Sequence, residues 1–390
     1  MSTRKFNGER LKSARIYRGL SITDLAKLAD VSKQAISQFE NDKNPPGLET
    51  LLKLISALGF PREFFYVDDS NEVKIGNTFF RSLMTTNKKD KLTQIEKTKY
   101  LSIIFNFLNS YLEFPTLNLP NVDTNKDVEE IAKSVREYWK LGTGPIPNLV
   151  NVLEKNGFIV TAFMTDNQKI DAFSQRQVIN GHEYYFMVLG NDKNTLGRRQ
   201  FDAAHELAHV LLHEWSVDLE TISKDEFREI EQQANQFAAA LLMPKDSFLE
   251  DINNSFATNL EYYVELKKKW RVSIQAMIVR AYNLKVINNA QYQNLMRGIS
   301  KRGWRTKEPL DNVLTVPKPT LLRKAVDILL ANKILDEEEL LVNLGKCGLP
   351  MDRREVELLL GLDQNKLAKK EIGIPVINIK ERSIPKTGEH

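Results

Sequence analysis

The sequence has little of what secreted and membrane proteins depend on. Its single cysteine, Cys347, excludes an internal disulfide, and it lacks the Cys and His neighbours of a metal cluster. The start, Met1 to Gly8, has no apolar signal segment. No apolar run approaches the roughly 20 residues of a membrane-spanning helix. We therefore expect a cytoplasmic protein with no membrane contact.

An excess of charge is also missing. The formal net charge is +4 over 390 residues, which by itself predicts neither nucleic-acid nor membrane binding. Residues 1–67 hold 11 Lys and Arg against 7 Asp and Glu, so their excess of four equals that of the whole chain. The basic character is therefore concentrated at the N-terminus. The length and the apolar content of 42% predict about two to three domains with real cores.

Histidine is scarce, yet three of the five histidines lie close together, as His205, His209 and His213. The first two form the pattern His205-Glu206-x-x-His209 inside an unbroken helical run. Residues i and i+4 share one face of a helix, so both imidazoles can reach one Zn²⁺ ion. Glu206 stands beside them to accept a proton from water. This spacing is typical of zinc hydrolases.

Such a site needs a third protein ligand and leaves the fourth position open. A third histidine ten residues after His205 is excluded, because Trp215 stands there and Leu212 occupies the place of the associated glycine turn. The alternative is a glutamate on the next helix.

That next helix is predicted over residues 227–243, where apolar residues recur at helical spacing and Pro244 ends the run. Glu231 borders the apolar face. Asn235 follows one turn later, where its amide could hold the second ring nitrogen of a ligand histidine.

These residues resemble the ImmA/IrrE family of zinc metallopeptidases, a gluzincin-like group of bacteria and their mobile elements. The resemblance covers roughly residues 125–250 and rests on His205-Glu-Leu-Ala-His209, on Glu231-x-x-Ala-Asn-x-Phe-Ala-x-x-Leu-Leu-Met-Pro244 and on the upstream residues 139–160. It implies one zinc ion per chain on His205, His209 and Glu231, with Glu206 as general base and Asn235 supporting a ligand. His213 fits neither ligand pattern, and we interpret it as a polar residue near the helix end.

The N-terminus carries an independent pattern. Four short helices are predicted over residues 9–18, 22–29, 33–41 and 48–58, and Ser21 and Ser32 stand at N-cap positions. The spacing of Ala26, Val31, Ile36 and Phe39 is that of a helix-turn-helix.

This segment resembles the Cro/repressor-type (XRE) DNA-binding domain. Asp30 stands at the turn position that most often holds glycine, and Asp tolerates the left-handed backbone needed there. In such domains the start of the second motif helix faces base edges, which nominates Lys33, Gln34, Ser37 and Gln38 as DNA contacts. The alternative is a helical bundle that binds a protein partner.

Composition places the remaining boundaries. We expect a helix-turn-helix domain (1–67), a helical linker with a possible dimer interface along the apolar stripe of residues 95–112 (68–124), a peptidase domain (125–258), a helical C-terminal domain (259–370) and an extended tail (371–390). Strands are predicted at 158–163 and 184–189. In gluzincin-like enzymes an edge strand binds the substrate backbone, and we expect the second strand or its neighbour to do so.

The expected fold is therefore multidomain and mainly α, with an all-α helix-turn-helix, a central α+β gluzincin-like metallopeptidase and a C-terminal helical domain. The predicted function is a DNA-binding regulator that binds its operator as a homodimer. Its zinc endopeptidase is predicted to cleave a repressor or antitoxin-type protein in a stress or mobile-element response. The alternative is a transcription factor whose zinc domain is only a sensor or structural module. Glu206 favours the peptidase, since a structural zinc site needs no base. Tyr184, Tyr185 and His213 are candidates for stabilising the oxyanion.

Overall fold

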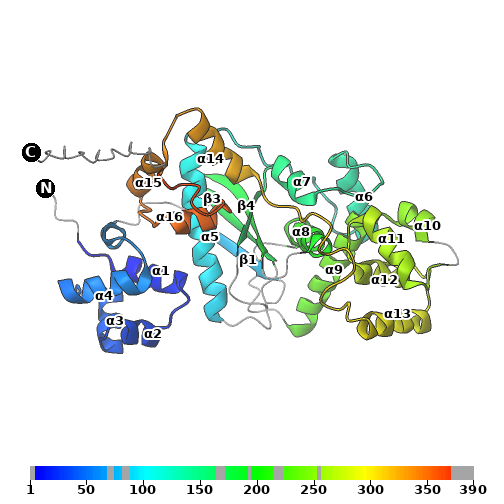
Figure 1. Cartoon of the computed structure of the whole chain (residues 1–390), viewed down its shortest axis with the longest axis horizontal. Coiled ribbons are helices and arrows are strands. Elements are labelled where there is room, and N and C mark those ends of the chain that lie inside the picture. The colour runs from blue at the N-terminus through cyan, green and yellow to red at the C-terminus, as the bar shows by residue number, and fades with distance from the viewer. Residues whose placement is uncertain are drawn as a thin grey trace, which may run out of the picture.

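The computed structural model describes residues 5–67, 74–80, 88–163, 172–191, 195–213, 223–252 and 256–369. A four-stranded sheet crosses the middle of the molecule in the order β1-β3-β4-β2 (Figure 1). The strands are β1 (Lys74–Phe80), β2 (Ile159–Phe163), β3 (Ala172–Ile179) and β4 (His182–Gly190). The β2–β4 pair is parallel and the others are antiparallel.

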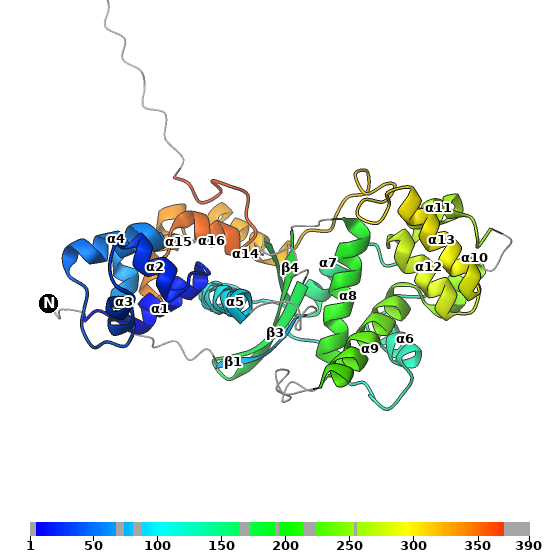
Figure 2. The same ribbon diagram turned by 90° about the horizontal axis from the view of Figure 1, so that it is seen from below.

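Helices cover both faces of this sheet, which divides the molecule into two halves (Figure 2). Alternation along β4 explains the division: Phe186 and Val188 belong to one apolar core, whereas Tyr185, Met187 and Leu189 belong to the other. Successive side chains of a strand point to opposite faces, so each face supplies one core. The predicted multidomain, mainly helical fold with a central α+β part is confirmed.

The first half begins with the four predicted N-terminal helices, α1 (Gly8–Tyr17), α2 (Ile22–Leu28), α3 (Lys33–Glu40) and α4 (Leu48–Leu58), followed by a 3-10 turn at Arg62–Tyr66. Ser21 and Ser32 cap α2 and α3 by accepting the backbone N–H of the third residue beyond. Asp30 has a φ of 54°, the left-handed conformation expected in the turn.

Helix α5 (Lys88–Asn109) lies between these helices and the sheet. Its apolar stripe is buried within the chain, and the ring of Tyr100 stacks on that of Tyr17 with 5.2 Å between centroids. The apolar face of residues 95–112, expected as a possible dimer interface, is thus covered by other parts of the same chain. The N-terminal helices share this core with α5 and do not enclose one of their own.

The predicted helical linker also contains a strand, since residues 74–80 form β1 at one edge of the sheet. β1 pairs with β3, and β4 is paired on both sides. β3 and β4 are therefore paired on both sides, whereas β2, the other neighbour of β4, forms the second edge of the sheet. The expectation that β4 or its neighbour binds substrate stays a prediction.

The second half holds α6 (Val128–Tyr138), α7 (Leu149–Lys155), α8 (Leu196–Leu212), α9 (Lys224–Leu242) and α10 (Lys245–Ile252). It also holds α11 (Leu260–Trp270), α12 (Ile274–Asn283) and α13 (Asn289–Lys301), whose apolar residues join the same core. Arg280 of α12 donates to the carbonyl oxygen of Met243 at 2.9 Å and pairs with Glu129 of α6. These three helices are therefore packed onto α6 and the end of α9.

The last described helices, α14 (Leu321–Ala331), α15 (Glu337–Lys346) and α16 (Arg353–Leu359), return to the first half. The hydroxyl of Tyr17 donates to Glu355 of α16 at 2.7 Å. The segment expected as one C-terminal domain thus contributes to both cores. The predicted tail, 371–390, lies outside the described residues. No helix in the described part of the chain is long and apolar enough to cross a membrane.

Candidate metal centre and DNA-binding helix

The metal-site residues lie where α8 packs against α9. Helix α8 is buried along almost its whole length, and His205, Glu206 and His209 are at most 1% exposed. Helix α9 begins with a capping box between Ser223 and Glu226, which satisfies its first N–H groups. Two turns later it brings Glu231 to the paired imidazoles.

Three ligand-type atoms converge at this point. The two histidine Nε2 atoms are 3.0 Å apart. Glu231 Oε2 lies 3.6 Å from Nε2 of His205, and its Oε1 lies 3.4 Å from Nε2 of His209. Among the described residues this is the group of acidic, His or Cys side chains whose geometry suits a metal ion.

These distances fit a tetrahedral zinc ion. Bonds of about 2.0–2.2 Å separate two ligand atoms of such an ion by roughly 3.3–3.6 Å. The nitrogen and oxygen donors are also the types that zinc prefers. His205, His209 and Glu231 can therefore hold one zinc ion with minor adjustment and leave a fourth position open.

The charge state of Glu231 suits the same role. Burial alone raises the pKa of this carboxyl group, but its contacts with His205 and His209 outweigh burial and lower the pKa to about 2. Its side chain is 17% exposed, whereas the two histidines are enclosed. The carboxylate is therefore ionised at neutral pH and forms the more open side of the cluster.

Glu206 is held by a hydrogen bond from a residue of the sheet. Ser174 of β3 lies on the face that packs against α8, and its hydroxyl donates to Glu206 Oε2 at 2.8 Å inside the core. The bond orients a carboxylate that the neighbouring histidines bracket in sequence. Ser174 was not nominated from the sequence, because its place opposite α8 depends on strand packing.

His213 contacts His209 on the side of its ring that faces away from the cluster. Its Nδ1 is 2.9 Å from Nδ1 of His209, and its Nε2 is 3.1 Å from Oε1 of Gln233 on α9. Burial, and next the charge of His209, lower the pKa of His213 to about 4, so the ring is neutral at pH 7. One tautomer satisfies both contacts of His213: Nδ1–H of His209 donates to His213, and Nε2–H of His213 donates to Gln233. Nε2 of His209 is then left as a lone pair toward the cluster.

The other nominated residues have different places. Among the hydrogen bonds of the described residues, none joins Asn235 to a ligand histidine, and His213 supports His209 instead. Tyr184 packs against Phe105 on the opposite face of the sheet, at 4.9 Å between ring centroids. It therefore cannot face the cluster. Tyr185 lies on the face of the sheet that packs against α8, where burial raises the pKa of its hydroxyl.

The predicted DNA-reading residues lie on α3. Lys33 and Gln34 are exposed, and Ser37 and Gln38 are half-buried. Gln38 accepts a hydrogen bond from the side-chain amide of Asn44 at 3.3 Å. The first turns of α3 are thus open to a major groove, while Ile36 faces the core.

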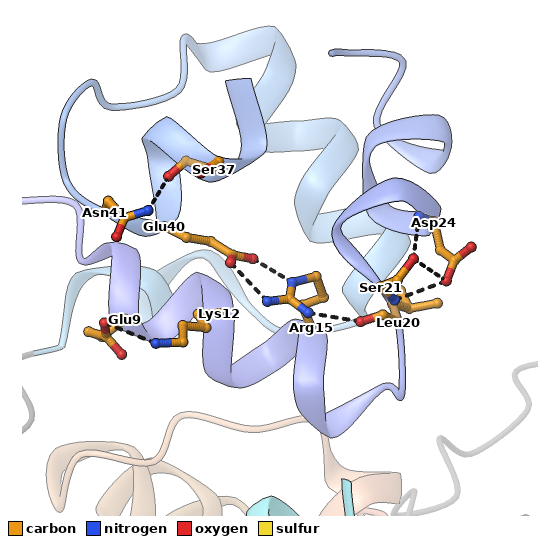
Figure 3. A network of polar contacts seen from close by, with 9 residues as sticks. All are labelled: Glu9, Lys12, Arg15, Leu20, Ser21, Asp24, Ser37, Glu40 and Asn41. Atoms are coloured by element: carbon orange, nitrogen blue, oxygen red, sulfur yellow. Dashed lines mark hydrogen bonds and ion pairs between the residues drawn. The ribbon is translucent and has the colours of Figure 1, made fainter. Parts of the chain in front are cut away.

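Polar contacts hold α3 against α1, as Figure 3 shows. The guanidinium group of Arg15 forms a two-bond pair with the carboxylate of Glu40, one bond measuring 2.9 Å. Arg15 also donates to the carbonyl oxygen of Leu20 at 2.9 Å, just before the cap of α2. One side chain of α1 therefore fixes both helices of the motif.

Comparison with protein families gives two matches. Residues 11–65 match the family model described as a helix-turn-helix, and residues 154–282 match the peptidase model described as the IrrE N-terminal-like domain. A search of curated proteins found no match. The second match includes α8, α9 and all three candidate ligands, and both families are those that the sequence resembles. The chain thus joins a helix-turn-helix DNA-binding domain to a domain of the IrrE N-terminal-like peptidase family.

Proposed function

We propose that the protein is a transcriptional regulator whose central domain is a zinc-dependent endopeptidase. The observation that carries the proposal is the convergence of His205, His209 and Glu231, with a buried glutamate, Glu206, between the two histidines in sequence. A structural zinc site has no need for such a base. The presence of Glu206 therefore favours hydrolysis over a purely structural or sensing role.

Zinc at this cluster would polarise the scissile carbonyl and lower the pKa of a water molecule. The chain supplies the proton transfer: Glu206 accepts the proton of the attacking water and then passes it to the leaving amine. Ser174 holds this carboxylate in place, and His213 with Gln233 holds the ring of His209. Each reacting group thus has a fixed orientation before substrate binds.

The substrate proposed is a protein of the repressor or antitoxin type, cleaved in a stress or mobile-element response in the cytoplasm. The DNA-binding part would place the peptidase at an operator through Lys33, Gln34, Ser37 and Gln38, and a homodimer would read two half-sites. We keep Asn235 as a residue that supports the ligand set, since it lies one turn after Glu231. We also keep residues 1–67, 68–124, 125–258, 259–370 and 371–390 as proposed functional segments.

Incubation of the purified, zinc-loaded protein with the products of its neighbouring genes tests this function. We expect a cut that a chelator abolishes and zinc restores, and that Glu206→Gln lacks. A regulator with a sensing or structural domain would bind its operator and leave every one of these proteins intact.

A further inference from the structure

Strand β1 occupies the edge of the sheet next to β3, the strand that carries Ser174. Residues 74–80 pair antiparallel with β3, with Lys74 opposite Val178 and Phe80 opposite Phe173. The register shifts by one residue between Ile75 and Thr78, as in a β-bulge. Without β1, β3 would be an open edge strand.

The pairing of β1 with β3 includes Ser174, the residue that contacts the proposed base Glu206. Phe79 is the register partner of Ser174, whose hydroxyl donates to Glu206 at 2.8 Å. Adjacent strands lie about 4.8 Å apart. The backbone around Phe79 is therefore one strand spacing from a residue in direct contact with Glu206. The opposite edge strand, β2, lies beyond β4 and is farther away.

A strand added to an open sheet edge is one of the general ways in which proteins bind an extended peptide. Here the added strand comes from the chain itself. It belongs to the segment that joins the helix-turn-helix, which ends in the 3-10 turn at Arg62–Tyr66, to α5. An extended peptide is thus already paired with the strand whose Ser174 contacts the proposed catalytic glutamate.

We propose that residues 74–80 are a substrate of the chain's own peptidase, which cuts next to Phe79. The inference rests on the proposed function. A water oxygen bonds to the carbonyl carbon of the scissile peptide and the C–N bond breaks. The N-terminal piece gains a carboxylate, and the C-terminal piece gains an amine that receives the water's proton through Glu206. Water is the only co-reactant.

The cut separates the DNA-binding helices covalently from the peptidase but does not release them at once. Tyr17 remains stacked on Tyr100 and hydrogen-bonded to Glu355, both of which belong to the C-terminal piece. The two pieces therefore stay together under native conditions and separate in denaturant. Self-cleavage would convert a tethered regulator into a dissociable one.

The experiment uses the full chain, purified with a chelator and then given zinc, followed by intact mass and N-terminal sequencing. We expect one new N-terminus, at Phe79 or Phe80, in the wild type and none in Glu206→Gln. A chain that stays intact with zinc bound overturns the inference, as does a cut at any other bond or one that persists in Glu206→Gln.

Strand occupancy is measured separately, by hydrogen exchange in the uncut Glu206→Gln protein. The amides that join β1 and β3 should be protected, and exchange at the rate of an unpaired segment contradicts the inference. Thr78→Pro with Phe79→Pro removes N–H donors from the paired part and should reduce self-cleavage at least tenfold. Asn77→Pro, in the bulge where pairing is already interrupted, is the matched control and should cut at nearly the wild-type rate.

The two proposals can fail separately. If the zinc-loaded protein cuts a neighbouring gene product but never itself, the peptidase stands and β1 is not its substrate. If it cuts neither, both proposals fall.

Discussion

Nδ1 of His213 lies 2.9 Å from Nδ1 of His209, and this contact links the third histidine of the cluster to a proposed zinc ligand. Gln233 fixes the other nitrogen of His213, so the orientation of the ligand ring is set by residues from both α8 and α9. Support of this kind holds the tautomer and raises ligand basicity.

Replacing His213 by Ala should weaken zinc affinity by about 10- to 100-fold while the fold persists, because His209 loses its orienting partner. Competition against a chromophoric chelator measures this change. Gln233→Ala, which removes only the outer contact, should have a smaller effect. Unchanged affinity in His213→Ala would show that the contact does not support the metal.

Changing His205, His209 or Glu231 to Ala should each lower the zinc content well below one ion per chain, because two protein ligands are too few for a stable site. Glu229→Ala is the control, since Glu229 lies on the same helix but is exposed. The measurement is the zinc content of each purified variant, and Glu229→Ala should keep about one ion per chain. Full occupancy in Glu231→Ala would require a different third ligand.

The double change Gln34→Ala and Gln38→Ala should weaken binding to the specific operator by roughly 1 to 3 kcal/mol per lost base contact. Lys33→Ala, if it removes a phosphate contact, should weaken binding to all sequences and lower the salt slope by about one. Gel-shift titrations at several salt concentrations separate the two. Zinc content should not change, and unaltered operator affinity in the double variant would mean that α3 is not the reading helix.

The pair between Arg15 and Glu40 should matter for stability, because the side chains are only 12% and 5% exposed. Arg15→Met leaves a buried carboxylate without its cation and should cost about 3 kcal/mol in urea unfolding. Lys12→Met breaks a pair whose side chains are 47% and 62% exposed, and should cost under about 1 kcal/mol. Equal losses in the two variants would contradict this ranking.

Local signals explain which parts of the structure were predictable. Caps and helical periodicity predicted the bounds of α1 to α4 within one or two residues. The helices that carry His205 and Glu231 were predicted from their apolar faces and from Pro244. The geometry at the metal centre then required only that two amphipathic helices pack together.

Long-range pairing was not predictable in the same way. Residues 74–80 contain a glycine and two polar residues in their middle and show no alternation, and their partner strand lies about a hundred residues later. The stripe on α5 indicated burial but could not say what covers it, since an apolar face packs equally well on a second copy or on the same chain. The role of His213 depended on a contact with the following helix.

Glu206→Gln gives the most direct test of the proposed zinc peptidase. The amide keeps the shape of the side chain but cannot accept a proton from water at neutral pH. We expect the variant to bind the same amount of zinc as the wild type and to hydrolyse protein at least about a hundredfold more slowly. Undiminished, chelator-sensitive hydrolysis by a zinc-loaded Glu206→Gln protein would contradict the account.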